Sequence, residues 1–265
     1  MSGPLSVVIL AAGFGSRMKS EQHKVLFRLA GVPMIELVIE AARGLDPERI
    51  VLVIGHGAEQ VRAATAHLDV EYVLQEQQLG TAHAFLQAAP LLEDGRSDLL
   101  VLNGDGALLT TATLQRLRQA KPGQGMALLT ARVPDPTGLG RVLKDSAGLV
   151  ERTVEHKDAG PGELLVDEIV VGTYLFDAQG FALARTLSNA NAAGEYYITD
   201  LIAAYRAAGL PVAAADTPAD EYAGVNDRVQ LAAAERTVLD RIRTGWMRSG
   251  VTMHIPESVY IERSV

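Results

Sequence analysis

The first 120 residues alternate between short apolar runs and amphipathic stretches. Apolar runs that are typical of buried parallel strands occupy residues 5–10, 50–54 and 99–102, and a shorter strand is predicted at 71–74. Helical spacing of apolar residues is found between them, at 33–43, 58–66, 81–89 and 111–119. Parallel strands joined by helices form a doubly wound, Rossmann-like α/β sheet. Ligands of such sheets bind at the carboxyl ends of the strands.

The pattern changes after Met126. Strand-like runs follow at residues 127–133, 141–143 and 169–176, with a Pro- and Gly-rich segment at 134–140 and a polar segment at 158–162. We expect these runs to form a mixed, partly antiparallel sheet that lies over the first one. Helical spacing returns at 197–208 and 227–249. The second of these helices is long enough to act as a connector.

Composition narrows the class of protein. The chain has 265 residues, of which 48% are hydrophobic, so it can bury a sizeable core. Its net charge of −8 argues against general binding of nucleic acid or of anionic membranes, because both require a basic surface. The sequence contains no cysteine, which excludes disulfides and thiolate metal sites and favours a cytoplasmic location. Its N-terminal apolar run lacks a basic start and is interpreted as a strand, not a signal peptide.

The first apolar run passes into a glycine-rich loop. Gly13 and Gly15 let the backbone approach a ligand, and free amides in such a loop can cradle phosphate oxygens. Arg17 and Lys24 add positive charge for a triphosphate. The Gly-Lys-Ser/Thr of a Walker A loop is missing, and the third glycine of a dinucleotide fingerprint is replaced by Met18. From the loop alone, phosphate binding is only slightly favoured over an ordinary turn between a strand and a helix.

Asp105 follows the third apolar run and has two interpretations. It could cap the N-terminus of a helix, or it could bind a metal at the carboxyl end of a strand, and the position favours the metal. His56 and His83 are interpreted as structural or surface residues. Neither has a second histidine or a carboxylate at the spacing of a metal site.

Several segments resemble one family in the same order. They are LAAGFGSRMK (10–19), KVL (24–26), LQEQQLGTAHA (74–84), DPTGLGR (135–141), VEHKDA (154–159), GEYYITD (194–200) and GVN (224–226). Together they resemble the nucleotide-sugar pyrophosphorylases. The similarity is greatest to the N-terminal uridyltransferase region of the bacterial bifunctional N-acetylglucosamine-1-phosphate uridyltransferase/glucosamine-1-phosphate acetyltransferases, and it covers about residues 5–261.

The resemblance implies a reaction and a set of site residues. The fold would be of the nucleotide-diphospho-sugar transferase type. UTP and N-acetylglucosamine 1-phosphate would give UDP-N-acetylglucosamine, a peptidoglycan and cell-wall precursor, and pyrophosphate, by Mg²⁺-assisted in-line attack on the α-phosphate. The implied positions are Ala12 and Gly13 for uridine; Arg17 and Lys24 for nucleotide and pyrophosphate oxygens; Gln75, Gly80 and Thr81 for uracil; Asp105 and Asn226 for Mg²⁺; and Gly140, Glu155, Tyr197 and Thr199 for the sugar phosphate. Of these, Arg17, Lys24 and Asp105 would be catalytic.

The same resemblance divides the chain into three regions. These are a nucleotidyltransferase domain (1–226), a connector helix (227–250) and the start of a left-handed β-helix (251–265). The segment HIPESVYI (254–261) resembles the entrance to the β-helix that carries the family's acetyltransferase and is expected to hold full-length relatives together as trimers. Only four residues follow Ile261, so we expect at most one turn, no acetyltransferase, and a truncated chain.

Three positions depart from the family pattern. His23 stands where a proline is usual before the loop lysine, and Gly106-Ala107 follows Asp105 in place of x-Pro. Val170 stands where the sugar-binding strand usually carries Asn. Loss of a buried hydrogen bond costs about 1–3 kcal/mol, so the sugar site would be weakened roughly ten- to a hundredfold.

Several interpretations of the valine follow. The enzyme could use a different sugar 1-phosphate, it could be weak, or its sugar site could be locally rebuilt. A shift of one residue in strand register would instead place Val170 in the core. From another class of protein, the chain could be a nucleotide-binding sensor without turnover.

Overall fold

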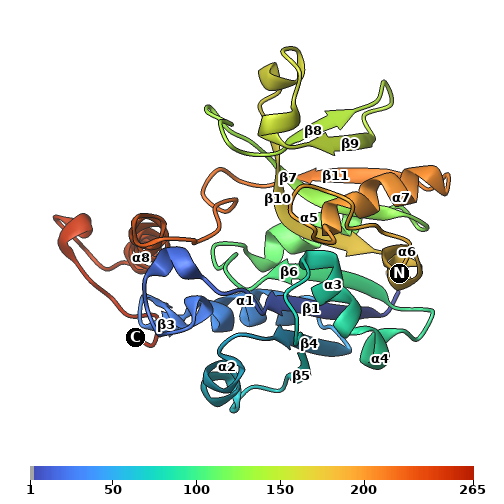
Figure 1. Ribbon diagram of the computed structural model, residues 1–265. Helices are drawn as coiled ribbons and strands as arrows, with labels where there is room; N and C mark the ends of the chain where they lie inside the picture. Colours follow the sequence, from blue (N-terminus) through green and yellow to red (C-terminus); the bar gives the residue numbers. More distant parts are fainter. Residues whose placement is uncertain (1–2) are drawn as a thin grey trace.

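Nine strands form one mixed sheet in the computed structural model, which describes residues 3–265 (Figure 1). The main path comprises β1 (Leu5–Ala11), β4 (Arg49–Ile54), β5 (Glu71–Leu74), β6 (Asp98–Asn103), β7 (Met126–Arg132), β10 (Glu168–Phe176) and β11 (Val212–Asp216). Their spatial order is β11-β7-β10-β6-β1-β4-β5. A hairpin of β8 (Arg141–Lys144) and β9 (Val150–Val154) pairs with β10 and stands away from the parallel half, and β2 (Arg28–Leu29) pairs separately with β3 (Val32–Pro33).

Helices cover both faces of the sheet. They are α1 (Met34–Arg43), α2 (Ala58–Thr65), α3 (Thr81–Gln87), α4 (Ala89–Leu92), α5 (Thr111–Ala120), α6 (Gly180–Ala184), α7 (Leu201–Ala207) and α8 (Arg228–Arg248). Alternate residues of β1 point to opposite faces, as in any strand. Val7 and Ile9 join the core beneath α1, α5 and α8, whereas Val8 joins the core beneath α3, α4, α6 and α7. The fold is therefore an α/β sandwich with one large apolar core on each face of the sheet and a small third cluster around Ala131, Val133 and Ile169.

The parallel half of the sheet confirms the pattern predicted for the first 120 residues. β1 pairs in parallel with β4 on one side and with β6 on the other. The chain runs outward through β4 to β5 and then returns to β6, so the strand order reverses at β1. Such a switch point leaves a crevice at the carboxyl ends of the two central strands.

The second half of the sheet corrects one prediction. No separate sheet lies over the first among residues 3–265. Instead, β10 pairs antiparallel with β6 and with β7 and joins the two halves edge to edge. The physical reason is that β6 would otherwise expose a row of unpaired backbone groups. Sequence pattern also missed β9 and β11, and the helix predicted at 197–208 is a 3-10 turn (Ile198–Asp200) followed by α7.

The C-terminal region contains the long helix that was predicted. After α8, residues 251–265 hold one 3-10 turn (Pro256–Ser258) and no strand. This segment returns to the parallel half, where the Arg263 amide donates to the Ala30 carbonyl over 2.9 Å. The division at 226 and 250 stays a prediction, and the first two residues of its first region lie outside the described residues. Among the described helices, none is long and apolar enough to span a membrane.

Candidate functional site

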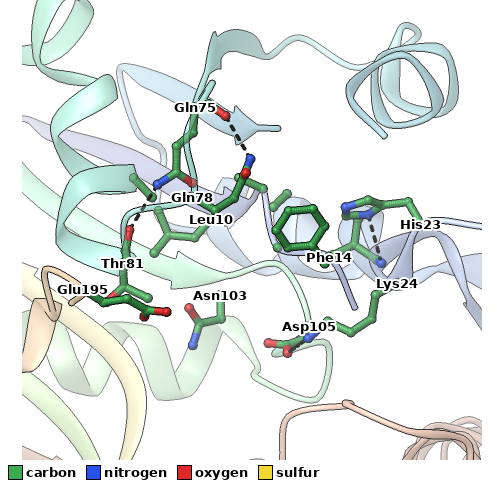
Figure 2. A pocket seen from close by; sticks show the side chains of 16 residues that line it. Leu10, Phe14, His23, Lys24, Gln75, Gln78, Thr81, Asn103, Asp105 and Glu195 are labelled. Atoms are coloured by element: carbon green, nitrogen blue, oxygen red, sulfur yellow. Dashed lines mark hydrogen bonds and ion pairs between the residues drawn. The ribbon is translucent and has the colours of Figure 1, made fainter. Parts of the chain in front are cut away.

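A cavity of about 400 Å³ opens at the switch point (Figure 2). The end of β1 and the glycine-rich loop form its floor, and the loop after β5 forms one wall. Of the site residues suggested by sequence, it brings together Ala12, Gly13, Lys24, Gln75, Gly80, Thr81 and Asp105. Figure 2 shows Gln75, Gln78 and Thr81 on one side, Lys24 and Asp105 on the other, and Asn103 between them.

The Gln75 side chain is held in one orientation inside this cavity. It is only 3% exposed. Its Nε2 donates to the Gly80 carbonyl over 3.1 Å and lies 3.0 Å from His83 Nδ1. No group in residues 3–265 donates a hydrogen bond to Gln75 Oε1, so this oxygen is available as an acceptor. His83, predicted to be structural, therefore orients a pocket residue.

The loop after β5 is fixed by close backbone contact with a later segment. Gly80 has φ +111°, and a Cβ at this position would lie 2.5 Å from the Tyr196 carbonyl oxygen, so only glycine fits. The Tyr196 amide donates to Leu79 over 2.8 Å. The Ile198 amide donates to the Thr81 hydroxyl over 2.9 Å. Thr81 therefore helps to position the loop.

A polar cluster closes the far end of the cavity. Asp105 lies two residues after β6, Asn226 lies just before α8, and Lys24 begins the 3-10 turn Lys24–Leu26. Lys24 Nζ contacts Asp105 Oδ2 at 2.5 Å and Asn226 Oδ1 at 3.1 Å. Arg17 Nη2 donates to the same Asn226 oxygen over 2.9 Å. Two hard oxygens thus converge on one cation.

This convergence fits a divalent cation such as Mg²⁺. Mg²⁺ takes one or two protein oxygens and completes its shell with water and phosphate oxygens, and the Lys24 ammonium stands where such a charge would lie. Residues 3–265 contain no group of three or more His, Cys, Asp or Glu side chains arranged for a metal.

Contacts at the start of α8 hold Asn226 in place. The Asn226 amide donates to Gln230 Oε1 over 2.7 Å, and the Gln230 amide donates to the Asp227 carboxylate over 2.8 Å. This reciprocal arrangement is a form of capping box. Arg228 Nε also donates to the Met18 carbonyl over 3.2 Å, which ties the glycine-rich loop to α8.

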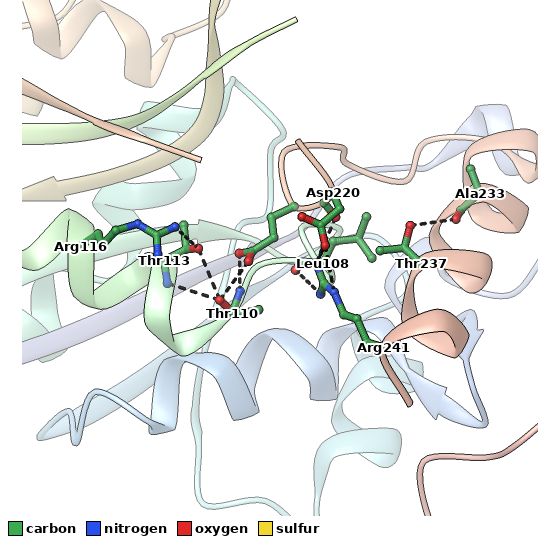
Figure 3. Close-up of polar contacts among 9 residues, drawn as sticks. Leu108, Thr110, Thr113, Arg116, Asp220, Ala233, Thr237 and Arg241 are labelled. Carbon is green, nitrogen blue, oxygen red and sulfur yellow. Dashed lines mark hydrogen bonds and ion pairs between the residues drawn. The ribbon is translucent and has the colours of Figure 1, made fainter. Parts of the chain in front are cut away.

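A second set of contacts fastens α8 to the loop that follows Asp105 (Figure 3). Arg241 donates to the Leu108 carbonyl over 2.8 Å and to the Asp220 carboxylate, also over 2.8 Å. The buried Glu221 carboxylate accepts from the Thr110 amide over 2.9 Å. Asp105 and Asn226 are far apart in the chain, and these contacts keep their loops together.

A second cavity, of about 670 Å³, adjoins the first. It lies among β10, the β8–β9 hairpin and the segment before α8, and it shares Asn103 and Asp105 with the first cavity. Of the suggested sugar-phosphate residues it is lined by Gly140, Glu155 and Thr199, and Asn226 also borders it. Val170 lines it too, so part of this half-buried side chain faces the cavity, while the rest packs against the apolar core beneath α3, α4, α6 and α7.

A buried arginine shapes the rim of the second cavity. Arg141 is 2% exposed and donates to the Pro136 carbonyl over 2.6 Å and to the Leu139 carbonyl. Its Nη2 lies 3.3 Å from His156 Nδ1, which can accept only when that nitrogen is unprotonated. The guanidinium therefore anchors the loop that presents Gly140 beside Glu155.

Two suggested residues line neither cavity. Arg17 is exposed and reaches the cluster only through Asn226, and Tyr197 lies half-buried beside the site. Sequence reasoning missed Asn103, which lines both cavities, and Gln78, whose Nε2 donates to the Gln75 carbonyl over 3.1 Å. Gln78 lies inside a segment already singled out. Asn103 precedes Gly104-Asp105 at a strand end, which was its only signal.

The histidine that departs from the family pattern is buried beneath the first cavity. His23 is 5% exposed, and Val25 donates its amide to His23 Nδ1 over 3.4 Å. Nε2 is buried without a hydrogen-bond partner in residues 3–265. Burial lowers the pKa of His23, and the neighbouring His56 and Lys24 lower it further, so the imidazole is neutral near pH 7.

Comparison with known proteins agrees with this geometry. The family described as the MobA-like NTP transferase domain matches residues 7–163. A "Bifunctional protein GlmU" of Thermus thermophilus is 49% identical over 259 residues, and that of Brevibacillus brevis is 46% identical over 266 residues. The aligned parts cover 97% and 98% of this chain but 57% of each relative, so the chain spans little more than half of their length. It corresponds to their N-terminal part.

A solved structure extends the likeness of the fold. The inositol-1-phosphate CTP transferase from T. maritima superposes with a TM-score of 0.70 at 16% sequence identity. The superposition covers 96% of this chain and all of that one. At so low an identity the match concerns the fold alone.

Proposed function

Because this chain belongs to the family of MobA-like NTP transferase domains and is a nucleotidyltransferase, we propose that it transfers the uridylyl group of UTP to N-acetylglucosamine 1-phosphate. One observation carries the proposal. Two adjacent cavities share Asn103 and Asp105, and a cluster of Lys24, Asp105 and Asn226 stands where they meet. This arrangement suits a transferase that joins two anionic substrates.

The first cavity would bind UTP. Ala12 and Gly13 would contact the uridine, and Gln75, Gly80 and Thr81 would select uracil. Because Gln75 Nε2 is engaged by Gly80 and His83, its Oε1 would serve as the acceptor and would match the N3–H donor of uracil. Cytosine offers an acceptor at N3, which would oppose that oxygen.

The second cavity would bind the sugar phosphate. Gly140, Glu155 and Thr199 line it, and Tyr197 would support it from beside the cavity. A Cβ at position 140 would lie 3.5 Å from Glu155 Oε1, so the carboxylate and the Gly140 backbone present a joint polar surface.

The reaction would be an in-line displacement. An oxygen of the sugar phosphate forms a bond to the α-phosphorus of UTP, the bond from that phosphorus to the bridging oxygen breaks, and pyrophosphate leaves with its electron pair. Both reactants are anions, so orientation and relief of charge repulsion account for most of the barrier. Arg17 and Lys24 would bind the phosphate oxygens, and no protein nucleophile or general base is needed.

Asp105 and Asn226 would hold Mg²⁺ in this scheme. When bound, the metal neutralises charge on the phosphate oxygens. Lys24 Nζ contacts both of these oxygens. A triphosphate would draw Lys24 toward itself and free both oxygens.

The wider setting belongs to the same proposal. The product would be UDP-N-acetylglucosamine for peptidoglycan synthesis in the cytoplasm. Residues 251–265 would form the beginning of a left-handed β-helix, through which longer relatives would assemble as trimers. The sequence similarity to GlmU proteins supports these statements.

Pyrophosphate release tests the function directly. The protein is incubated with UTP, Mg²⁺ and a panel of sugar 1-phosphates that includes N-acetylglucosamine 1-phosphate and glucose 1-phosphate. We expect release with N-acetylglucosamine 1-phosphate. Release only with another sugar would redirect the substrate assignment, as the valine at position 170 allows. UTP binding without release from any sugar would identify a nucleotide sensor instead.

A further inference from the structure

Asn103 occupies the wall that separates the two cavities. It is the last residue of β6, where it pairs with Leu10 of β1. The Gly106 amide donates to the Asn103 carbonyl over 3.0 Å, and the Gly104 amide donates to the Leu10 carbonyl over 2.9 Å. The backbone on both sides of the residue is therefore fixed, and the side chain lines both cavities (Figure 2).

The amide group of Asn103 is directed at β10 of the second cavity. A Cβ at position 172 would lie 2.5 Å from Asn103 Nδ2, so Gly172 is the residue that admits the amide. Gly172 has φ +78° and lies in the irregular stretch between Val170 and Tyr174, where the pairing of β10 with β7 shifts register. Across residues 3–265 no side chain or backbone group bonds to the Asn103 amide, which leaves its donors for a ligand.

Asn103 and Val170 lie on the same face of the sheet. Tyr174 of β10 pairs with Val101 of β6, and continuing this antiparallel register by two residues sets Asn103 opposite Gly172. Val101 and Tyr174 belong to the apolar core beneath α3, α4, α6 and α7, and Val170 packs against the same core, so Val170 lies on that side of the sheet in spite of the irregular stretch. The side chains of Asn103 and Val170 both line the second cavity.

We propose that Asn103 supplies the amide that the sugar site lacks at position 170, and that it determines sugar specificity. Its Nδ2 would donate to an oxygen of the sugar, from β6 instead of β10. This inference rests on the proposed function and assigns a recognition group to the second cavity. The aliphatic wall at Val170 is then a rebuilt site with its hydrogen-bond donor moved to the neighbouring strand.

The kinetic test uses Asn103→Leu, which keeps the shape and removes the donors. We expect kcat/KM for the sugar phosphate to fall about ten- to a hundredfold, the factor for one buried hydrogen bond, with the KM for UTP within about twofold. Gln119→Leu removes an exposed amide from α5 and is the matched control, with near-native kinetics expected. Asn103→Ala and thermal melting of each variant show whether a loss reflects unfolding.

Rescue provides the decisive comparison. Adding Val170→Asn to Asn103→Leu returns an amide to the cavity, and we expect most of the lost kcat/KM to return. Three outcomes would overturn the proposal: unchanged sugar kinetics in Asn103→Leu, a loss that falls on the KM for UTP, or a double variant no better than Asn103→Leu in a folded protein.

A binding measurement separates this inference from the proposed reaction. Calorimetric titration with UDP-N-acetylglucosamine and with UDP needs no turnover. We expect Asn103→Leu to weaken the first ligand about ten- to a hundredfold and to leave UDP unchanged. If the wild type shows no turnover but this difference persists, the reaction is wrong and the role of Asn103 stands. Equal effects on both ligands would refute the role of Asn103.

Discussion

The two cavities are built in different ways. In the first, polar groups are held by the backbone at the carboxyl ends of parallel strands, and Gln75 is buried with its amide nitrogen engaged. In the second, an antiparallel strand and a projecting hairpin present an exposed carboxylate, Glu155, beside the aliphatic Val170.

The difference concerns how tightly recognition is specified. A buried amide oxygen whose amide nitrogen is already hydrogen-bonded discriminates strongly between ligands, because a mismatched ligand leaves polar groups unpaired. An exposed carboxylate can be satisfied by water and discriminates less. We therefore expect strict choice of the nucleotide base and looser choice of the sugar.

The largest effect should come from Asp105, one of the two residues that the cavities share. Asp105→Asn removes the anionic oxygen that contacts Lys24 and would bind Mg²⁺, and we expect kcat/KM to fall at least about a hundredfold with the fold retained. Steady-state kinetics at fixed Mg²⁺ measure the effect, and circular dichroism checks the fold. Asp69→Asn, an exposed carboxylate before β5, is the matched control. A near-native rate for Asp105→Asn would refute the metal assignment.

Base choice tests the first cavity. We expect kcat/KM for CTP to be at least about a hundredfold below that for UTP, because in the proposed complex Gln75 Oε1 would face the N3 position as an acceptor. Parallel assays with both nucleotides measure the ratio. Gln75→Glu replaces the Nε2 that donates to the Gly80 carbonyl with an oxygen, so the side chain loses the contact that orients it. We expect the ratio of UTP to CTP turnover to fall sharply in this variant. Comparable turnover of CTP and UTP by the wild type would remove the contrast between the cavities.

A smaller effect is expected from the neutral member of the cluster. Asn226→Ala removes an amide oxygen that water can replace, so we expect about a tenfold loss in kcat/KM, in line with one hydrogen bond or ligand contact. A titration of Mg²⁺ should show that higher concentrations recover part of the rate. If the loss equals that of Asp105→Asn, the two residues do not differ as ligands in the way proposed.

The smallest effect concerns the floor of the first cavity. Burial lowers the pKa of His23 below its ordinary value of 6.5, so the unfolded chain takes up this proton first as the pH falls. The contribution of His23 to the free energy of unfolding is fully present above about pH 6.5. It is lost as the pH falls through the lowered pKa of the folded state. His23→Asn should reduce the drop in Tm between pH 7.5 and 5 by on the order of a few degrees. An unchanged pH profile would show that His23 is not the titrating group.

Sequence predicted the parallel half of the fold well because three of its four strands, β1, β4 and β6, are continuous apolar runs separated by helices. It placed β1, β4 and β6 correctly, and seven suggested residues line the first cavity. The ligand roles of those residues stay predictions. The antiparallel half was placed wrongly because the apolar pattern of a strand does not show which strand it pairs with. β10 pairs with β6, which comes much earlier in the chain.

Asn103 illustrates why the rest of the site escaped prediction. Its importance depends on the register of β10 against β6 and on the φ of Gly172, and neither is visible in the sequence. Arg17 and Tyr197 show the converse: their positions match the family's motifs, yet neither side chain lines a cavity. A motif locates a residue in the chain, whereas only the packing shows what that residue faces.

The insertion of β10 between β6 and β7 has a consequence for biosynthesis. β6 and β7 both leave the ribosome before β10, which is the strand that pairs with each of them. One edge of β6 therefore stays unpaired until residues 168–176 emerge. An exposed edge strand is a template for aggregation, and contacts between distant residues form slowly. A nascent chain that stalls before β10 would present that edge to its neighbours, so chaperone demand should peak in this interval of translation.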